Sequence, residues 1–174
     1  MQYHLMTKDE LKRVAELDRR EVIDAVYYYR DGALDLVPEH WDVPEWSSKE
    51  KQQKIEVLRE IHNRNGTIFG AFDESSVAGV IALDSEYIGR NNDQLNLAEL
   101  FVSKQYRKMG VGKALVALVT QKAREMGVKK LYVSATPSQN TVDFYMKRGF
   151  RLAQEVNPKL FELEPEDIHL ELEL

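Results

Sequence analysis

The sequence predicts an α/β (α+β) domain in which a mixed β-sheet is covered by helices. Residues 67–103 contain three apolar, β-branched segments separated by short turns, which is the pattern of an antiparallel meander. From residue 110 onward, helical and strand patterns alternate, which favours strand–helix–strand units. The length of 174 residues, with 43% hydrophobic and 30% charged residues, suits a single globular domain with one buried core.

The N-terminal segment is predicted to be helical. Thr7 and Glu10 have the spacing of a capping box, in which the two side chains satisfy free backbone N–H groups at a helix start. We therefore expect a helix, whole or in two pieces, that begins at Thr7. The apolar residues that recur at helical spacing are Leu11, Val14, Val22, Ala25, Val26 and Tyr29.

A long loop and a second helix are expected next. Residues 27–45 contain glycine, prolines and a tryptophan, which is typical of a loop anchored by aromatic side chains. Ser47 and Glu50 form another capping-box pattern, followed by apolar residues at helical spacing. Asn65-Gly66 predicts the end of this helix, because both residues tolerate the left-handed conformation.

The middle of the chain predicts three strands. Residues 67–72 and 77–88 read as a hairpin, with Asp73-Glu74-Ser75-Ser76 as its turn. Residues 89–93 form a second turn, and residues 95–103 form the third strand.

Two further helices and three strands complete the prediction. A helix over 110–126 ends at Gly127 and is followed by a short apolar strand over 131–135. Ser138 can cap a helix that runs to Arg148 and ends at Gly149. Strands then follow from Phe150 and over 168–174, where apolar and polar residues alternate without a break.

Composition excludes several kinds of site. The chain has no cysteine, so disulfides, thiolate zinc sites, iron–sulfur clusters and a cysteine nucleophile are ruled out. The four histidines form no i, i+4 pair, and we expect no metal. The sequence shows no apolar signal core at its start and no apolar run long enough for a bilayer, so we expect a cytoplasmic protein with no membrane partner.

A loop with two glycines joins the third strand to the next helix. Gly110 and Gly112 allow close approach of a ligand to the backbone, and the helix start offers free N–H groups at the positive end of its dipole. Arg107, Lys108 and Lys113 add positive charge, and Arg107 can make bidentate contacts. The segment is therefore predicted to bind an anion, most reasonably a phosphate.

Two common phosphate motifs do not match this loop. A Walker P-loop requires a glycine where Arg107 stands and a hydroxyl residue where Ala114 stands. The dinucleotide-binding pattern requires a third glycine where Leu115 stands. Binding of a nucleoside triphosphate or of NAD is therefore disfavoured.

Two segments resemble motifs of the Gcn5-related N-acetyltransferase (GNAT) superfamily. Arg107-Lys108-Met109-Gly110-Val111-Gly112 resembles the family's Arg/Gln-x-x-Gly-x-Gly/Ala signature, and residues 140–150, with Asn-x-x-x-x-Tyr-x-x-x-Gly-Phe, resemble its asparagine–tyrosine–Gly-Phe segment. The resemblance implies a mixed, mostly antiparallel central sheet of about six to seven strands flanked by about four helices. It also implies one domain over 1–174, with acceptor-side elements in about 7–66 and an acetyl-CoA-binding core in about 67–174.

The resemblance implies transfer of an acetyl group from acetyl-CoA to a primary amine, by direct attack through a tetrahedral intermediate. In the family the pyrophosphate lies on the glycine loop, the pantetheine arm pairs with the motif strand, and a backbone N–H of that strand faces the thioester carbonyl. The cofactor-binding residues implied here are Phe101, Val102, Arg107, Lys108, Met109, Gly110, Val111, Gly112, Lys113, Asn140 and Tyr145.

Two side chains are candidates for proton transfer. Tyr145 is the candidate general acid, because the family places a tyrosine near the sulfur and the leaving thiolate needs a proton. Glu99 occupies a strand position that the family often uses for a base, with Glu86 and Asp84 as alternatives. Strand parity places Glu99 on the same face as Leu97 unless a bulge intervenes.

The acceptor is not fixed by the sequence. In the family the N-terminal elements wall the acceptor pocket, here about residues 19–46, where aromatic and acidic side chains suit a cationic small-molecule or peptide amine. The alternative is that these aromatics only anchor a loop. Residues 103–130 carry eight cations and one anion, so the remainder is strongly acidic and a nucleic-acid partner is disfavoured.

Two further alternatives stay open. One is a non-catalytic acyl-CoA-binding sensor or regulatory domain, which would not need the hydroxyl of Tyr145. The other concerns assembly: a homodimer is common in the superfamily, but no feature of this sequence determines it.

Overall fold

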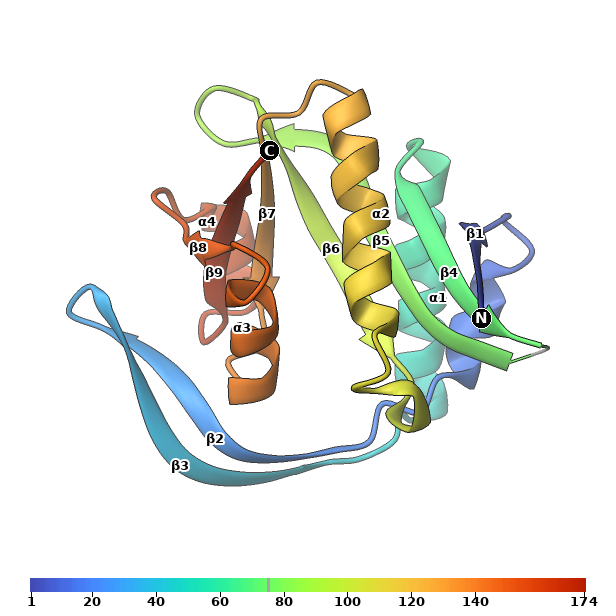
Figure 1. The fold of residues 1–174 in the computed structure, drawn as a ribbon, viewed down its shortest axis with the longest axis horizontal. Coiled ribbons are helices and arrows are strands. Elements are labelled where there is room, and N and C mark those ends of the chain that lie inside the picture. Colours follow the sequence, from blue (N-terminus) through green and yellow to red (C-terminus); the bar gives the residue numbers. More distant parts are fainter. Residues whose placement is uncertain (75) are drawn as a thin grey trace.

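The computed structural model describes residues 1–74 and 76–174. In this part of the chain, seven strands form one sheet in the order β1-β4-β5-β6-β7-β9-β8 (Figure 1). All neighbouring pairs are antiparallel except β6 and β7, which are parallel. The sheet strands are β1 (Gln2–Leu5), β4 (Thr67–Asp73), β5 (Ser76–Ile88), β6 (Gln94–Val102), β7 (Lys130–Ala135), β8 (Arg151–Leu152) and β9 (Ile168–Glu173).

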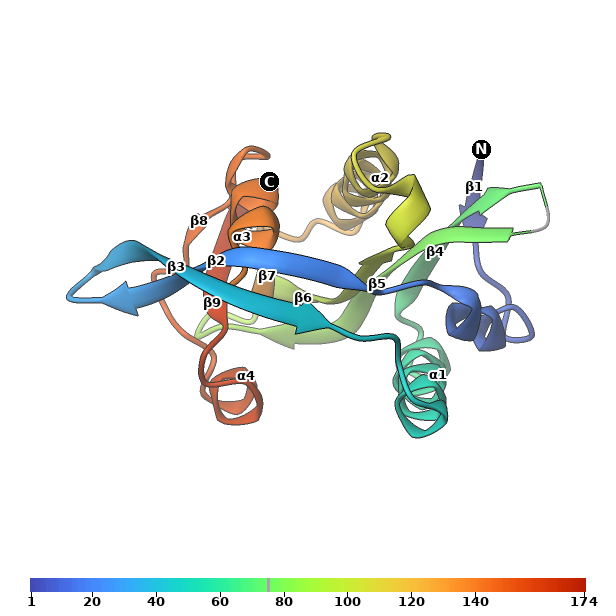
Figure 2. The same cartoon turned by 90° about the horizontal axis from the view of Figure 1, so that it is seen from below.

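Helices cover both faces of this sheet (Figure 2). Helices α2 (Val111–Glu125) and α3 (Gln139–Met146) lie on one face, whereas α1 (Ser48–Asn63) and α4 (Pro158–Leu163) lie on the other. Each face buries its own apolar core, with Leu115 in the core under α2 and Leu58 in the core under α1. The predicted mixed, mostly antiparallel sheet flanked by helices is confirmed. No helix of the described residues combines the length and apolar character needed to cross a bilayer.

Most predicted boundaries lie within a few residues of the observed ones. The Ser47–Glu50 capping box is present: the Ser47 hydroxyl accepts from the Glu50 N–H at 3.3 Å, and the Glu50 carboxylate accepts from the Ser47 N–H at 2.8 Å. Asn65 adopts φ = +65°, which ends the run of α1 as expected. The predicted turn over residues 73–76 includes Ser75, which lies outside the described residues.

The prediction for residues 7–45 was wrong over most of its length. Glu10 accepts a hydrogen bond from the Thr7 N–H at 2.8 Å, but only a short 3₁₀ helix, η1 (Leu11–Glu16), follows. Strands β2 (Glu21–Arg30) and β3 (Ala33–Val43) then form a long antiparallel hairpin. Asp31 and Gly32 both have positive φ, +50° and +84°, which suits the tight turn between twisted strands.

Two short elements were not predicted. Strand β1 forms one edge of the sheet, where it pairs with β4, and its four residues are all exposed. Helix α4 begins after Asn157, whose side chain accepts hydrogen bonds from the backbone N–H groups of Lys159 and Leu160 at 3.1 and 3.2 Å. The Asn157-Pro158 pair is a helix-start signal of the kind that finds such a helix.

Candidate functional site

Strands β6 and β7 diverge after a short parallel contact. They pair only from Gln94 to Asn96 against Lys130 to Tyr132, and Figure 1 shows them separating towards the start of α2. Beyond Asn96, β6 pairs with β5 on one side only. The backbone polar groups on its other edge are therefore free to bind an extended ligand.

A cavity of about 730 Å³ lies at this divergence. Its wall combines the end of β6, the glycine loop, helix α3 and the base of the β2–β3 hairpin. A volume of this size is in the usual range for ligand pockets. Of the predicted site residues, those that line the cavity are Phe101, Val102, Arg107, Lys108, Gly110, Gly112, Lys113, Asn140 and Tyr145.

The glycine loop leads into α2 through two residues with left-handed backbone. Lys108 has φ = +62° and Gly110 has φ = +88°, and α2 begins at Val111. The first N–H groups of the helix have no intrahelical acceptor, so they are available as donors to an anion. A Cβ added at Gly112 would lie 3.1 Å from the Phe144 ring, which explains why this position has no side chain.

Arg107 has a structural role in addition to its charge. Its guanidinium donates to the carbonyl oxygens of Val102 at 3.0 Å, Arg20 at 2.9 Å and Arg19 at 2.8 Å, and lies 3.5 Å from Glu21. These contacts join the end of β6 to the start of β2. Arg107 therefore positions the loop, whereas the exposed Lys108 and Lys113 remain available for an anionic ligand.

Two other predicted contact residues differ in their surroundings. Met109, in the glycine loop, is 68% exposed and is not among the residues that line the cavity. Asn140, in the first turn of α3, donates to the Glu21 carboxylate at 3.3 Å. The hairpin thus reaches α3 across the cavity, a contact that the sequence prediction of a loop did not include.

Tyr145 lies in an aromatic environment on the cavity wall. It is 4% exposed, and its ring makes edge contacts with Phe144 and Phe150 at centroid distances of 5.2 and 5.1 Å. Burial raises the pKa of Tyr145, and the negative charge of Glu99 raises it further. The hydroxyl has no hydrogen-bond partner among the described residues, so a protonated donor is available to a ligand at neutral pH.

Glu99 faces the side of the sheet that α1 covers. Glu99 pairs with Ala82 and Leu97 with Leu83, so the intervening residue 98 is a bulge in β6. The bulge separates Glu99 from the face of Leu97. The Lys54 ammonium lies 2.9 Å from the Glu99 carboxylate, and although this contact lowers the pKa of Glu99, burial is the larger effect and the pKa is raised overall.

The other carboxylates considered as a base lie elsewhere. Asp84 makes a bidentate ion pair with Arg64, at 2.8 and 2.6 Å. Glu86 is exposed on the same strand. None of the three carboxylates lines the cavity, but the negative charge of Glu99 raises the pKa of Tyr145, which does line it.

The aromatic residues of the N-terminal region have different roles. Trp46 is buried against Phe101, with an edge contact at 4.7 Å. Tyr27 donates to Asp143 at 2.9 Å and Tyr28 donates to Glu39 at 2.9 Å. Trp41 alone of the aromatic residues between 19 and 46 lines the cavity within the described part of the chain. Tyr27 therefore anchors the hairpin to α3, whereas Tyr28 joins the two strands of the hairpin.

Together, the free strand edge, the helix N-terminus and the adjoining cavity suit an extended ligand with an anionic group. Residues 34–150 match the model of the acetyltransferase (GNAT) family, so the chain belongs to that family. Its curated relatives include N-acetyltransferase 8F1 and N-acetyltransferase family 8 member 2 of Rattus norvegicus. These are 31% and 30% identical over 98 residues, which is 55% of this chain and 44% and 43% of the relatives. The chain thus matches less than half the length of these relatives.

Solved structures share the fold over nearly the whole chain. Nourseothricin acetyltransferase superposes with a TM-score of 0.72 at 19% identity, covering 99% of this chain and 97% of that one. A Bacillus anthracis protein assigned as a streptothricin acetyltransferase, in complex with acetyl coenzyme A, gives a TM-score of 0.73 at 19% identity, covering 99% and 98%. At these identities the matches show the fold.

Gly112→Val is expected to weaken acetyl-CoA binding by about tenfold or more, because the added side chain crowds Phe144 and shifts the first turn of α2. Isothermal titration calorimetry with acetyl-CoA measures the change. Ala117→Val is a matched control, since it adds a β-branched side chain at an exposed position of the same helix. Equal affinities for wild type and Gly112→Val would contradict the assignment of this loop.

Proposed function

We propose that this protein is an acetyl-CoA-dependent N-acetyltransferase that acetylates a primary amine of a small molecule or peptide. The observation that carries the proposal is the divergence of β6 from β7 beside the start of α2, with Tyr145 and Glu99 close to it. Membership of the GNAT family supports the reaction class. The substrate and the roles of individual residues belong to the proposal.

The residues at the site fit the acetyl donor. The free edge of β6 at Phe101 and Val102 suits the amide groups of a pantetheine arm, and the start of α2 suits a pyrophosphate. Lys108 and Lys113 add charge for the phosphates, and Asn140, which lines the cavity, contacts the arm in this proposal. When bound, acetyl-CoA supplies an acetyl group activated as a thioester.

The acceptor amine must lose a proton to react. An alkyl ammonium with a pKa near 10.4 is neutral in roughly one molecule in a few thousand at pH 7. Glu99 takes this proton, directly or through water, while the amine nitrogen forms a bond to the acetyl carbon. The nitrogen releases its second proton to solvent as the carbon–sulfur bond breaks, and Tyr145 donates its proton to the sulfur and takes one back from solvent. Since the chain contains no cysteine, transfer is direct, with no thiol-bound acyl-enzyme.

Thiol release from acetyl-CoA across a panel of primary amines tests the proposal. We expect amine-dependent release for at least one class of amine. Parallel calorimetry with acetyl-CoA separates binding from turnover. Acetyl-CoA binding with no turnover on any amine would instead identify a non-catalytic acyl-CoA sensor, and absence of both would overturn the assignment of the cavity.

A further inference from the structure

The base of the β2–β3 hairpin presents one of its faces to the cavity. Glu21 pairs with Val43 and Ile23 pairs with Trp41, and residues two apart on a strand share a face. All four residues line the cavity. Asp42, between Trp41 and Val43, lies on the opposite face, and its side chain is 79% exposed. The wall that the hairpin forms is therefore apolar except for Glu21.

The acidic residues of the hairpin offer the cavity no free carboxylate. Among them, Glu21 alone lines the cavity. Its carboxylate lies 3.5 Å from the Arg107 guanidinium and accepts from the Asn140 side-chain amide at 3.3 Å. Asp42, on the outer face, lies 3.5 Å from His40. The negative charge that favours a cationic acceptor in the sequence is thus already paired at the cavity or faces away from it.

Positive charge dominates the polar part of the lining. Glu21 is the one carboxylate among the described residues that line the cavity. The cationic residues of the lining are Arg19, Arg107, Lys108, Lys113 and Arg148. The donor phosphates can pair with the cations of the glycine loop, but a second ammonium group on the acceptor would find no free carboxylate on this wall. Because an unpaired charge is costly to remove from water, the wall disfavours a polyamine.

The two tryptophans of this region have different surroundings. Trp46 is buried, its ring lies 4.7 Å from that of Phe101, and the Arg19 guanidinium lies 5.8 Å from it. Trp41 is partly exposed in the cavity. Among the described residues, its ring has no aromatic or cationic partner and its indole N–H has no acceptor. Since aromatic rings pack well on one another, Trp41 offers a surface for a ring of the ligand.

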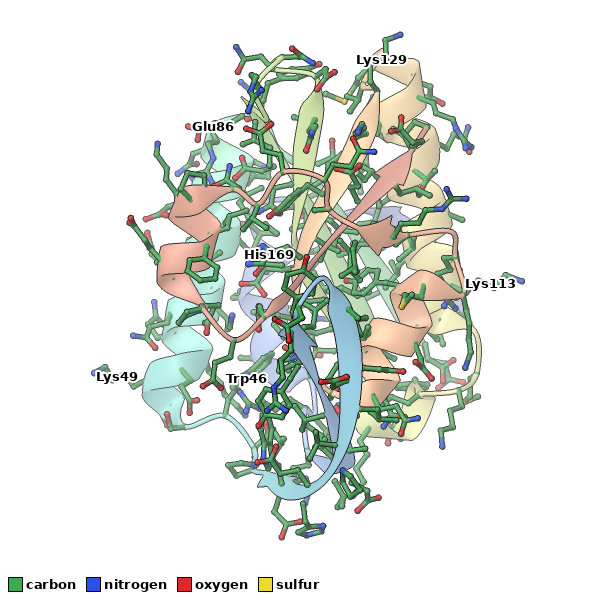
Figure 3. The ribbon with its side chains drawn as sticks, turned by 90° about the vertical axis from the view of Figure 1, so that its left-hand side faces the viewer. Trp46, Lys49, Glu86, Lys113, Lys129 and His169 are labelled. Atoms are coloured by element: carbon green, nitrogen blue, oxygen red, sulfur yellow. The ribbon has the colours of Figure 1, made fainter. Side chains whose placement is uncertain are left out.

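Contacts beyond the end of β3 connect this wall with Glu99. Trp46 follows β3 and packs on Phe101 of β6. The Lys54 ammonium lies 5.1 Å from the centroid of the Phe101 ring and 2.9 Å from the Glu99 carboxylate. Figure 3 shows the hairpin between α1 and α3, with Trp46 beside it. The wall therefore lies between the glycine loop, which Glu21 contacts through Arg107, and the side of β6 that carries Glu99.

We infer that the acceptor is an arylalkylamine, a primary amine on a short alkyl chain that ends in an aromatic ring, and that Trp41 determines this specificity. The inference rests on the proposed function, in which Glu99 takes the proton of the reacting amine. The ring then packs on Trp41 beside the apolar side chains of Ile23 and Val43, where burial of its surface stabilises the complex. The one ammonium group of such an acceptor is the group that reacts, so no second charge needs a partner.

Steady-state kinetics with 3-phenylpropylamine, propylamine and 1,5-diaminopentane test this specificity. The first two amines differ by the ring alone. Wild type is expected to have a kcat/KM about tenfold or more higher for 3-phenylpropylamine than for either of the others, because only that amine has a ring to pack on Trp41. A ratio near one between 3-phenylpropylamine and propylamine, or a kcat/KM that is highest for the diamine, would overturn the inference.

Variants of Trp41 test the residue itself. Trp41→Ala is expected to lower the ratio of kcat/KM between 3-phenylpropylamine and propylamine by about tenfold, mainly through KM, whereas Trp41→Phe should keep most of the ratio. Acetyl-CoA affinity, measured by calorimetry, should stay close to that of wild type in both variants. Leu36→Ala is the matched control, a change at a 42% exposed residue of β3 outside the cavity lining.

Two results with these variants would decide against Trp41. One is an unchanged ratio in Trp41→Ala, and the other is a loss of acetyl-CoA affinity in place of a change in the ratio. Thermal melting checks that each variant keeps the fold. If Trp41→Ala does not fold, Trp41→Leu, which keeps an apolar side chain without a ring, is expected to lower the ratio in the same direction, and an unchanged ratio would again overturn the inference.

Turnover of no amine would contradict the proposed function separately. Calorimetric binding of 3-phenylpropylamine in the presence of coenzyme A then tests the specificity without catalysis. Binding to wild type that weakens by about tenfold in Trp41→Ala supports the inference. Absence of binding to wild type, or equal binding to both proteins, overturns it.

Discussion

Tyr145→Phe is expected to lower kcat for amine acetylation by about 10²- to 10⁴-fold, the range of a positioned general acid. The variant removes one hydroxyl and keeps the ring that packs between Phe144 and Phe150. Because that hydroxyl has no partner among the described residues, the free energy of unfolding should change little. Acetyl-CoA affinity should also stay close to that of wild type.

Stopped-time assays of thiol release and calorimetry with acetyl-CoA measure these two quantities. Tyr87→Phe is a matched control, because Tyr87 is 44% exposed on β5 and lies outside the cavity lining. A variant with wild-type kcat would remove Tyr145 from the proton-transfer step. Loss of acetyl-CoA binding with unchanged kcat would give Tyr145 a binding role instead.

Glu99→Gln is expected to lower kcat/KM for the amine by about 10²-fold or more, since the amide cannot take a proton. In wild type, Glu99 acts only when ionised, so activity falls as the pH drops through its pKa. Burial raises that pKa. The acidic limb of the pH profile, where kcat/KM falls as the pH drops, therefore lies above the ordinary titration range of glutamate. Glu99→Gln should remove this limb.

Lys54→Met provides a sharper version of this test. Lys54 lowers the pKa of Glu99, so its removal is expected to move the acidic limb of kcat/KM to higher pH. Glu86→Gln, a change of an exposed glutamate on β5, should leave the limb in place. An acidic limb that is unchanged in both Glu99→Gln and Lys54→Met would show that another group or water takes the proton.

The core of the site could be predicted because its signals are local. Gly110 and Gly112 mark a backbone that turns into a helix start, and that requirement is visible in the residues themselves. The spacing of apolar residues also indicates which side of each later helix and strand faces the core. The alternation in 168–174 predicted β9 nearly to the residue, since its period is two.

The N-terminal hairpin was missed because two periodicities compete there. Val22, Val26 and Tyr29 fit a helical stripe, but the segment also carries β-branched and aromatic residues in near succession, and pairing with β3 decides the outcome. Asp31-Gly32 was the local signal for the hairpin turn. Long-range hydrogen bonds such as that from Tyr27 to Asp143 help to hold the β2–β3 hairpin in place, and no pattern in the local sequence indicates them.

Residue roles at the site depended on contacts between distant segments. The bulge at residue 98 sets the face of Glu99, and Lys54, the ion-pair partner that lowers its pKa against the larger effect of burial, lies 45 positions earlier. In the same way, Arg107 was predicted to contact phosphate, but its donors bind the carbonyls of Arg19, Arg20 and Val102. Neither arrangement follows from spacing along the chain.

The most direct test of acetyl transfer uses acetyl-CoA labelled with ¹³C in the acetyl group. Wild type is incubated with labelled donor and the primary amine that gives the fastest thiol release in the panel, and mass spectrometry follows both the amine and the intact protein. We expect the label on the amine in equal amount to the coenzyme A released, with no labelled acetyl group retained on the chain during turnover. An unlabelled amine after donor consumption, or label that accumulates on the protein and then passes to the amine, would contradict direct transfer.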